Sequence, residues 1–224
     1  KPDIGLFTGG GIINPMILDC FSRGVINVHM GILPYYKGMD VVQSAIVEGR
    51  NNLVGLTSHL MESGIDTGPI IHYQSSIYPK DCIIPLDFEN YSLKKFLNFY
   101  STFIKNIKSG ENFKLKAQLD YLGRYNPRLS TKDNSFINWD WDYYELYNFI
   151  NSFDEPYSGS QTFINRGDFG PVSVKSVHLH GGDSLTHPYM SGLIYRHDKD
   201  WLVVSTSGKY SLLIEKVIDS DGND

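Results

Sequence analysis

The chain has 224 residues, 41% hydrophobic and 20% charged, a composition typical of a globular protein with a sizeable core. Its net charge of −5 gives no general basic surface for nucleic acids or membranes. Two cysteines, Cys20 and Cys82, are too few for a disulfide framework or a zinc site and suit a reducing cytosol. No apolar run approaches the roughly 18 residues of a membrane span. We therefore expect a cytoplasmic protein without a membrane partner.

Strand-like runs occur at regular intervals in the first third of the chain. Short apolar segments bounded by glycine, proline or polar residues predict strands at 4–8, 25–29, 53–61 and 69–74. Because helical patterns separate the earlier runs, the order favours an α/β fold with right-handed crossovers. We expect an open, mostly parallel, Rossmann-like sheet, of which this chain holds a part.

Two helices are predicted between these strands. Asn14 is a suitable N-cap and Pro15 a suitable first helical residue, and Gly24 stands just past the expected end of the first helix. Asp40 can cap the second helix, and Gly49 can end it.

The clearest helix is predicted at 92–108, where apolar and aromatic residues recur at helical spacing and lysines avoid that stripe. We interpret the stripe as core rather than as a cofactor-binding surface. Polar, irregular residues follow, and a helix is then expected at 139–153. Strands are expected at 161–165, 171–179, 191–197, 201–206 and 210–217. The predicted organisation is therefore an α/β domain at 1–110, a linker at 111–124 and a small β-rich domain at 125–224.

Three polar residues stand out where predicted strands meet loops. Asn27 and His29 close the second predicted strand, and Asp66 lies in the turn between two others. In open α/β sheets, ligands bind at the carboxyl ends of strands, so the three side chains could share one crevice. Amide and imidazole N–H groups can stabilise an oxyanion, and a carboxylate can orient an imidazole and a water for proton transfer. This chemistry suits attack by an amine on an activated carbonyl.

The segments around these residues resemble a known family. The run Asn27-Val28-His29-Met30-Gly31-Ile32-Leu33-Pro34-Tyr35-Tyr36-Lys37-Gly38 is similar to a signature of the 10-formyltetrahydrofolate-dependent formyltransferases. Ser63-Gly64-Ile65-Asp66-Thr67-Gly68-Pro69 resembles that family's Asp-Thr-Gly loop, and Leu56-Thr57-Ser58-His59 resembles the stretch before it. Gly11-Ile12-Ile13-Asn14-Pro15 resembles the loop that lines the pteridine pocket. Residues 1–75 thus resemble the later half of the catalytic domain, which implies that upstream residues of a full-length member are absent.

The resemblance implies a role for each matching residue. Asn27 would hydrogen-bond the formyl oxygen, His29 would stabilise the oxyanion and help to move the proton, and Asp66 would orient His29 and a water. The formyl donor 10-formyltetrahydrofolate would bind through its pteridine at Gly11, Ile12, Ile13, Ile65, Asp66 and Thr67. The second domain is also similar to family members, at Ile137-Asn138-Trp139 and at Pro156-Tyr157-Ser158-Gly159-Ser160.

Other polar residues have simpler interpretations. His59 lies on a predicted strand and is interpreted as a hydrogen-bonded core histidine. His178 and His180 share one face of a strand, which favours a solvated face over a metal site, and we expect no metal. Residues 9–11 form a glycine-rich turn without the Gly-Lys-Ser/Thr of a phosphate-binding loop. Lys37 could meet a phosphate or the glutamate tail of folate, or be solvated.

The amine acceptor is the least determined part of the function. Residues 125–224 contain 14 Asp plus Glu against 8 Lys plus Arg, whereas a tRNA-binding domain should present a basic surface. We therefore expect a nucleotide-linked amino sugar, with formylation in surface-polysaccharide synthesis, and methionyl-tRNA as the alternative. Hydrolysis of the formyl donor and non-catalytic binding of folate or sugar stay open, as does the activity of this chain by itself. The oligomeric state is also open, and a homodimer is among the assemblies that fit.

Overall fold

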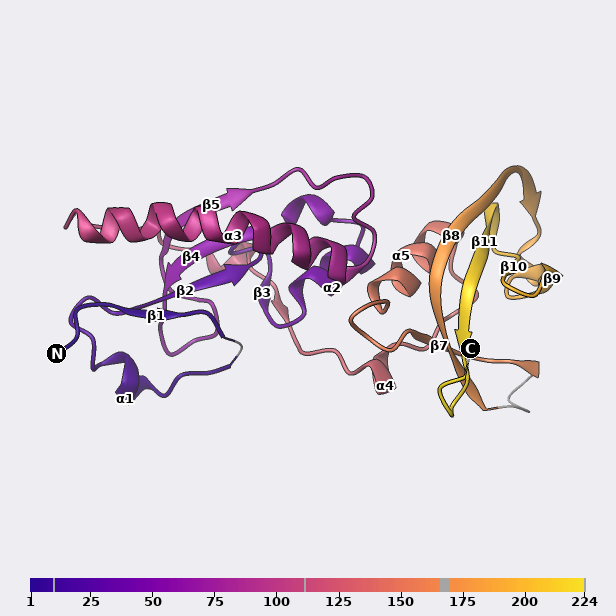
Figure 1. The fold of residues 1–224 in the computed structure, drawn as a ribbon, viewed down its shortest axis with the longest axis horizontal. Helices are drawn as coiled ribbons and strands as arrows, with labels where there is room; N and C mark the ends of the chain where they lie inside the picture. Colours follow the sequence, from indigo (N-terminus) through magenta and orange to yellow (C-terminus); the bar gives the residue numbers. More distant parts are fainter. Residues whose placement is uncertain (10, 111, 166–169, 224) are drawn as a thin grey trace. The chain divides into compact units, whose positions relative to one another are not determined.

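The computed structural model describes residues 1–9, 11–110, 112–165 and 170–223 (Figure 1). The chain divides into two compact units. The first contains residues 1–45, 50–82 and 87–128, and the second contains residues 129–224 with the short segments 46–49 and 83–86. Residues 112–128, which include most of the segment expected to be a linker, thus belong to the first unit. Among the described residues, no helix is both long and apolar enough to cross a bilayer.

A mixed sheet is the centre of the first unit. Its strands lie in the order β1-β2-β4-β5, with bounds Gly5–Phe7, Val25–Met30, Gly55–Leu60 and Ile70–Ser75. The α/β class is confirmed, but the expected predominance of parallel pairs needs correction. Only β1 and β2 run parallel, and the β2–β4 and β4–β5 pairs of this sheet are antiparallel. The loop between β4 and β5 is shorter than the dozen or more residues that a parallel crossover requires, so these strands form a hairpin.

Short helices connect the strands of this unit. The N-cap role predicted for Asn14 is confirmed, because its Oδ1 accepts a hydrogen bond from the Met16 amide in α1 (Pro15–Leu18). This helix ends earlier than predicted, since the amides of Ser22 and Arg23 donate to carbonyls of residues 2 and 3 instead. The second predicted helix is α2 (Val41–Val47), followed by a 3₁₀ turn, η1 (Asn51–Leu53).

The long helix α3 (Pro85–Lys108) begins seven residues before its predicted start (Figure 1). Proline is well suited to the first turn of a helix, where its missing N–H would have no intrahelical partner, and Asp87 favours the same end electrostatically. Its buried face is formed by Phe88, Ser92, Phe99 and Phe103. The predicted stripe is therefore only partly core, because Leu93 and Leu97 are exposed.

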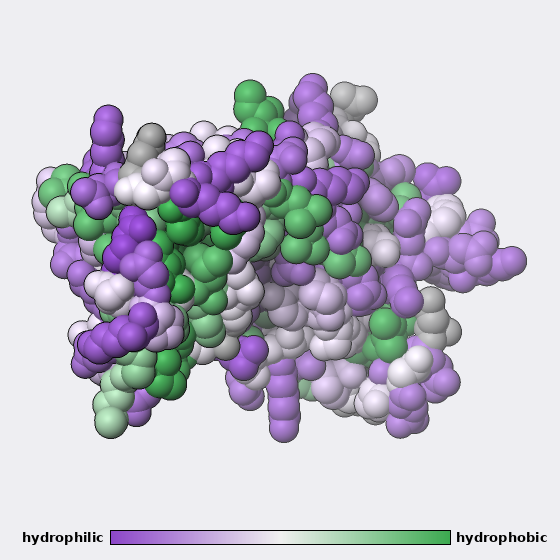
Figure 2. All heavy atoms as spheres, turned by 60° about the vertical axis from the view of Figure 1, so that its left-hand side comes forward, coloured by the Kyte–Doolittle hydropathy of each residue, from purple (hydrophilic) through white to green (hydrophobic). Residues whose placement is uncertain are grey.

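Several large hydrophobic side chains of the first unit lie on its surface. In Figure 2 the left-hand side of Figure 1 comes forward, and hydrophobic residues on this surface are interrupted by hydrophilic ones. The exposed residues include Ile12, Met16, Leu93 and Leu97. The remaining elements of the unit are β3 (Lys37–Gly38), the 3₁₀ turn η2 (Asp120–Leu122) and β6 (Tyr125–Asn126), and β3 pairs with β6 in parallel.

The second unit is β-rich, as predicted. Its sheet has the order β7-β8-β11-β10-β9, with bounds Ser160–Phe163, Pro171–Thr186, Gly208–Ile218, Leu202–Val204 and Ile194–His197. Two helices, α4 (Thr131–Asn134) and α5 (Tyr143–Ser152), and the 3₁₀ turn η4 (Pro188–Met190) complete it. Asp142 and Glu145 form a capping box at the start of α5. Leu146 and Ile150 of α5 pack in one core cluster with buried valines, leucine and isoleucine of the sheet.

Candidate active site

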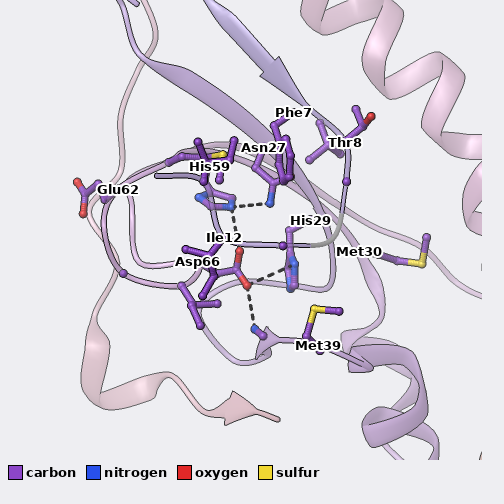
Figure 3. Close-up of a pocket in the computed structure, with 18 of the residues that line it drawn as sticks. Phe7, Thr8, Ile12, Asn27, His29, Met30, Met39, His59, Glu62 and Asp66 are labelled. Atoms are coloured by element: carbon purple, nitrogen blue, oxygen red, sulfur yellow. Dashed lines mark hydrogen bonds and ion pairs between the residues drawn. The ribbon is translucent and has the colours of Figure 1, made fainter. Parts of the chain in front are cut away.

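A cavity of about 610 Å³ opens beside strand β2 in the first unit (Figure 3). Asn27 and His29 both line it because residues two apart on a strand point to the same face. Strand β4 pairs with β2 in the register that sets His59 opposite Asn27. Residues directly opposite each other in a sheet project to the same side. The strand register therefore brings an amide and two imidazoles to one wall of the cavity.

Asp66 extends from the β4–β5 loop toward these three side chains (Figure 3). Its backbone has a φ of 53°, an uncommon conformation that Asp tolerates better than most residues. Oδ2 accepts a hydrogen bond from the Gly38 amide at 2.8 Å and lies 3.6 Å from Nδ1 of His29. Oδ1 lies 3.4 Å from Nε2 of His59. The carboxylate therefore joins two histidines and one backbone amide.

Hydrogen-bond partners determine which nitrogen of each ring carries a proton. Nε2 of His29 lies 2.9 Å from the Tyr36 carbonyl, and Nδ1 of His59 lies 3.0 Å from the Leu60 carbonyl. Because a carbonyl only accepts, both of these nitrogens are donors. The nitrogen that can gain or lose a proton in each ring is therefore the one that faces Asp66.

Nε2 of His59 lies between Asn27 and Asp66 and contacts both of them. Nδ2 of Asn27 lies 3.3 Å away and can donate to this nitrogen when it is unprotonated. When it is protonated, the same nitrogen can donate to Asp66. Asn27 is largely buried, and it also lines the cavity.

Burial and charge act in opposite directions on the acid–base groups. Burial lowers the pKa of His29 below its usual 6.5, although the negative charge of Asp66 and the bond to Tyr36 oppose this effect. Burial alone would raise the pKa of Asp66, but the hydrogen bond with His59, the charge of His29 and the Gly38 amide outweigh it. The pKa of Asp66 is lowered to about 2. At neutral pH the site therefore holds a carboxylate beside a histidine that is readily deprotonated.

The rest of the cavity wall is largely apolar. Gly11, Ile12, Ile13, Ile65 and Asp66 all line it. Thr67 lies in the same loop but packs its side chain against Gly64 and is not among the lining residues. Of the predicted glycine turn, Gly10 lies outside the described residues. The cavity thus offers a predominantly apolar wall beside a cluster of proton donors and acceptors.

Two residues in the cluster were not assigned to the site from sequence. His59 was interpreted as a core histidine, and it is buried, but it also contacts Asn27 and Asp66. Gly38 supplies a backbone donor, which no side-chain pattern reveals. The alternation of side chains along strands would place His59 beside Asn27 once the register between β2 and β4 is known.

Two further groups have structural partners. Lys37 is buried and its Nζ lies 2.9 Å from Oδ1 of Asp120, so it forms an ion pair within the unit. His178 lies 3.3 Å from Glu215 with both side chains about half exposed. Among the residues that the structure describes, no cluster of three or more metal-ligating side chains is present.

The chain also matches known proteins. The formyl transferase model matches residues 7–83, and the model of the formyl transferase C-terminal domain matches residues 129–223. The methionyl-tRNA formyltransferase of Syntrophomonas wolfei is 31% identical over 166 residues, which are 74% of this chain and 52% of that protein. The chain spans between about half and two thirds of the length of the first curated relatives it matches.

Solved structures share the fold. HypX from Aquifex aeolicus, in complex with tetrahydrofolic acid, matches with a TM-score of 0.69 and 15% identity, over 98% of this chain and 36% of that one. An N-formyltransferase from Helicobacter canadensis, in complex with folinic acid and dTDP-3-aminofucose, matches with a TM-score of 0.64 and 20% identity. That match covers 85% of this chain and 65% of the other. With two family models matched in order along most of its length, the chain belongs to the formyltransferase family.

Proposed function

We propose that the protein containing this chain transfers a formyl group from 10-formyltetrahydrofolate to the primary amine of a nucleotide-linked amino sugar. The observation that carries this proposal is the convergence of Asn27, His29, His59 and Asp66 at one wall of the cavity. These residues provide hydrogen-bond donors for a developing oxyanion and a group that can exchange a proton.

The cavity fits the formyl donor chemically. A pteridine is a flat ring system with polar edges, and a site for it needs apolar walls with backbone groups at the rim. Ile12, which is 78% exposed in this chain, and Ile65 supply apolar surface at the cavity. Gly11 has a φ of 145°, so its loop follows a path that residues with a Cβ rarely adopt. When bound, the donor would supply an acyl carbon at the formyl oxidation level.

Each polar side chain has a separate task in this reaction. Asn27 would donate its free Nδ2–H to the formyl oxygen as negative charge develops there. Removal of one such donor costs about 3–4 kcal/mol of transition-state stabilisation in well-studied enzymes. Nδ1 of His29 would exchange the proton that the attacking amine loses and the departing nitrogen gains. Asp66 would hold His29 in position and favour its protonated state while charge develops.

The acceptor assignment depends on charge and on the structural likeness. The excess of acidic residues in 125–224 gives little attraction for a polyanion such as tRNA. Lys175, one of the few cations there, is buried and donates to Glu155 and to the carbonyl of Tyr157. The likeness to an N-formyltransferase crystallised with dTDP-3-aminofucose also supports a nucleotide sugar.

Methionyl-tRNA is the second candidate acceptor. The first curated relatives are methionyl-tRNA formyltransferases, and one is 31% identical over 74% of this chain. A local basic surface on residues outside this chain would be compatible with that assignment. The two candidates share the formyl donor and the chemistry of Asn27, His29 and Asp66, and they differ in the acceptor that must be bound, a nucleotide diphosphate sugar or a tRNA.

The experiment is an acceptor screen on the intact protein with 10-formyltetrahydrofolate. Formylated product is measured for dTDP- and GDP-linked amino sugars and for initiator methionyl-tRNA, and free formate is measured without an amine. We expect turnover of an amino sugar, abolished in His29→Gln and retained in a His72→Gln control, because His72 is an exposed residue of β5 that does not line the cavity.

Each other outcome has a definite meaning. Turnover of methionyl-tRNA alone would reject the sugar assignment and keep formyl transfer. Formate release at the same rate with and without amines would indicate a hydrolase. Binding of the folate with neither formylation of an acceptor nor release of formate would indicate a non-catalytic protein.

A further inference from the structure

A segment at the end of the first unit contacts both elements that hold Asp66. We define residues 116–126 as the strap. At its start, Lys116 and Ile70 exchange two backbone hydrogen bonds of 2.8 Å. At its end, the strap pairs with β3 through β6, and the amide of Met39 donates to the carbonyl of Asn126 at 2.9 Å. The strap therefore fastens the first residue of β5, just after the Asp66 loop, at one point and the Gly38 segment at another.

Gln118 makes the contact nearest to the catalytic carboxylate. Its Nε2 donates to the carbonyl of Asp66 at 2.8 Å and to the carbonyl of Gly68 at 2.6 Å. These two carbonyls flank the turn in which Asp66 has its uncommon positive φ. Oε1 of Gln118 is buried and has no hydrogen-bond partner among the described residues, so the side chain acts here as a donor.

The other end of the strap positions the Gly38 amide, which donates a hydrogen bond to Asp66. The backbone N–H of Lys37 donates to the carbonyl of Arg124, and the side-chain Nδ2 of Asn126 donates to the carbonyl of Lys37. Lys37 also pairs through its buried side chain with Asp120 in the middle of the strap. Gly38 is thereby held with its N–H directed at Oδ2 of Asp66. Both the backbone and the carboxylate of Asp66 thus depend on this one segment.

We propose that Gln118 is a positioning residue for the reaction, holding Asp66 at its distance from His29 and from Gly38. This inference rests on the proposed function for its kinetic consequence, but its structural consequence can be measured without any substrate. Catalytic geometry that slips by about 1 Å can cost on the order of 100-fold in rate. Without the Gln118 donor, two carbonyls of the turn at residue 66 lose the partner that they have among the described residues, and the carboxylate moves away from Gly38 and His29.

The test uses the intact protein with Gln118→Leu, which keeps the size of the side chain and removes its donor, and Gln118→Glu, which replaces the donor by an oxygen. The matched control is Gln74→Leu, because Gln74 is exposed on β5. We expect kcat to fall by at least about tenfold in both Gln118 variants, with a much smaller change in KM, and to be unchanged in Gln74→Leu.

A second measurement reports on Asp66 directly. The Gly38 amide proton should show a pH-dependent NMR shift that follows ionisation of Asp66, and this dependence should disappear in Gln118→Leu and persist in Gln74→Leu. Thermal unfolding is recorded for every variant, and if Gln118→Leu does not fold, Gln118→Glu and the Gly38 signal still give the answer.

The outcomes separate this proposal from the function on which it rests. Folded Gln118 variants with normal kcat and an unchanged Gly38 signal would overturn the role of Gln118 and leave formyl transfer intact. A wild-type protein without any transferase activity would reject the proposed function, whereas loss of the Gly38 response in Gln118→Leu would still support the hold on Asp66.

Discussion

Nε2 of His59 lies 3.4 Å from Oδ1 of Asp66, and it is the only nitrogen of that ring not committed to a carbonyl. Together with Nδ1 of His29, which faces the other carboxylate oxygen, it makes Asp66 the shared partner of two imidazoles. The negative charge of Asp66 favours protonation of His29, whereas a positive charge on His59 disfavours it. The proton at Nδ1 of His29 therefore depends on both of these neighbours.

The carboxylate of Asp66 should be required for turnover. Asp66→Asn keeps the size of the side chain but removes the charge that favours protonated His29. We expect kcat to fall by roughly 100-fold or more, the usual range for loss of assisted proton transfer, with a small change in KM. Steady-state kinetics with the acceptor identified by the screen will measure this. Wild-type rates in a folded Asp66→Asn protein would contradict the assigned role.

The stability of the first unit should depend on pH through Asp66. Its pKa is about 2 in the folded chain against a usual 3.8, so the unfolded state binds the proton first as the pH falls. The stabilisation is complete above about pH 4 and is lost as the pH falls through 2, and it amounts to on the order of 2 kcal/mol. Urea unfolding between pH 2.5 and pH 5 should therefore show a steeper loss of stability for the wild type than for Asp66→Asn.

His29 should add a second dependence at higher pH. Burial lowers its pKa below 6.5 in the folded state, so the unfolded chain is again the better proton acceptor. Stability should fall as the pH drops below about 6.5, and His29→Gln should flatten this part of the curve. Unfolding measured from pH 5 to pH 8 tests the sign. Stability that rises on acidification in this range would show that the charge of Asp66 dominates over burial.

His59 should affect both the rate and the fold. His59→Phe keeps a ring of similar size but leaves the amide of Asn27 and one oxygen of Asp66 without this partner. Loss of a buried partner costs about 1–3 kcal/mol, and we expect a destabilisation of that size with at least a tenfold lower kcat. The control is His72→Phe, on the next strand, where the residue is exposed and its ring stacks on Phe99, a contact that phenylalanine can keep. Equal effects of the two substitutions would remove the special role of His59.

The sequence predicted which polar residues line the cavity better than it predicted how they are connected. Asn27, His29 and Asp66 carry side chains whose chemistry is visible in the sequence, and all three line one cavity. The contribution of His59 depends on the register between β2 and β4, which the apolar pattern of a buried strand does not determine. The antiparallel direction of β4 was missed for the same reason, because hydrophobic runs contain no information on strand polarity.

The strap illustrates a different limit of sequence interpretation. Residues 116–126 have no regular apolar period, so they were interpreted as a linker and its surroundings. Their contacts are mostly made by backbone groups and by polar side chains such as Gln118 and Asn126, and these contacts depend on the tertiary arrangement of the unit rather than on a local apolar pattern. The length of α3 was underestimated because its first two turns depend on Pro85 and on burial of Phe88 rather than on the periodic stripe.

Gly38 should tolerate no side chain, because its backbone and its surroundings both exclude one. Its φ is 96°, and a Cβ at this position would lie 2.2 Å from the Asn126 carbonyl oxygen. Gly38→Ala must therefore separate β3 from β6 and displace the amide that Asp66 accepts from. Gly110→Ala is the matched control, since Gly110 also has a positive φ, of 72°, but a Cβ there would meet nothing within 4 Å.

The two alanine variants separate conformational strain from steric clash. An unfavourable φ alone costs on the order of 1 kcal/mol, which is the loss of stability we expect for Gly110→Ala, with unchanged activity. Gly38→Ala should lose several times as much stability in chemical unfolding, together with most of its kcat in the folded fraction. Similar losses of stability in both variants, with kcat retained in Gly38→Ala, would show that the contact between Gly38 and Asp66 is dispensable for the reaction.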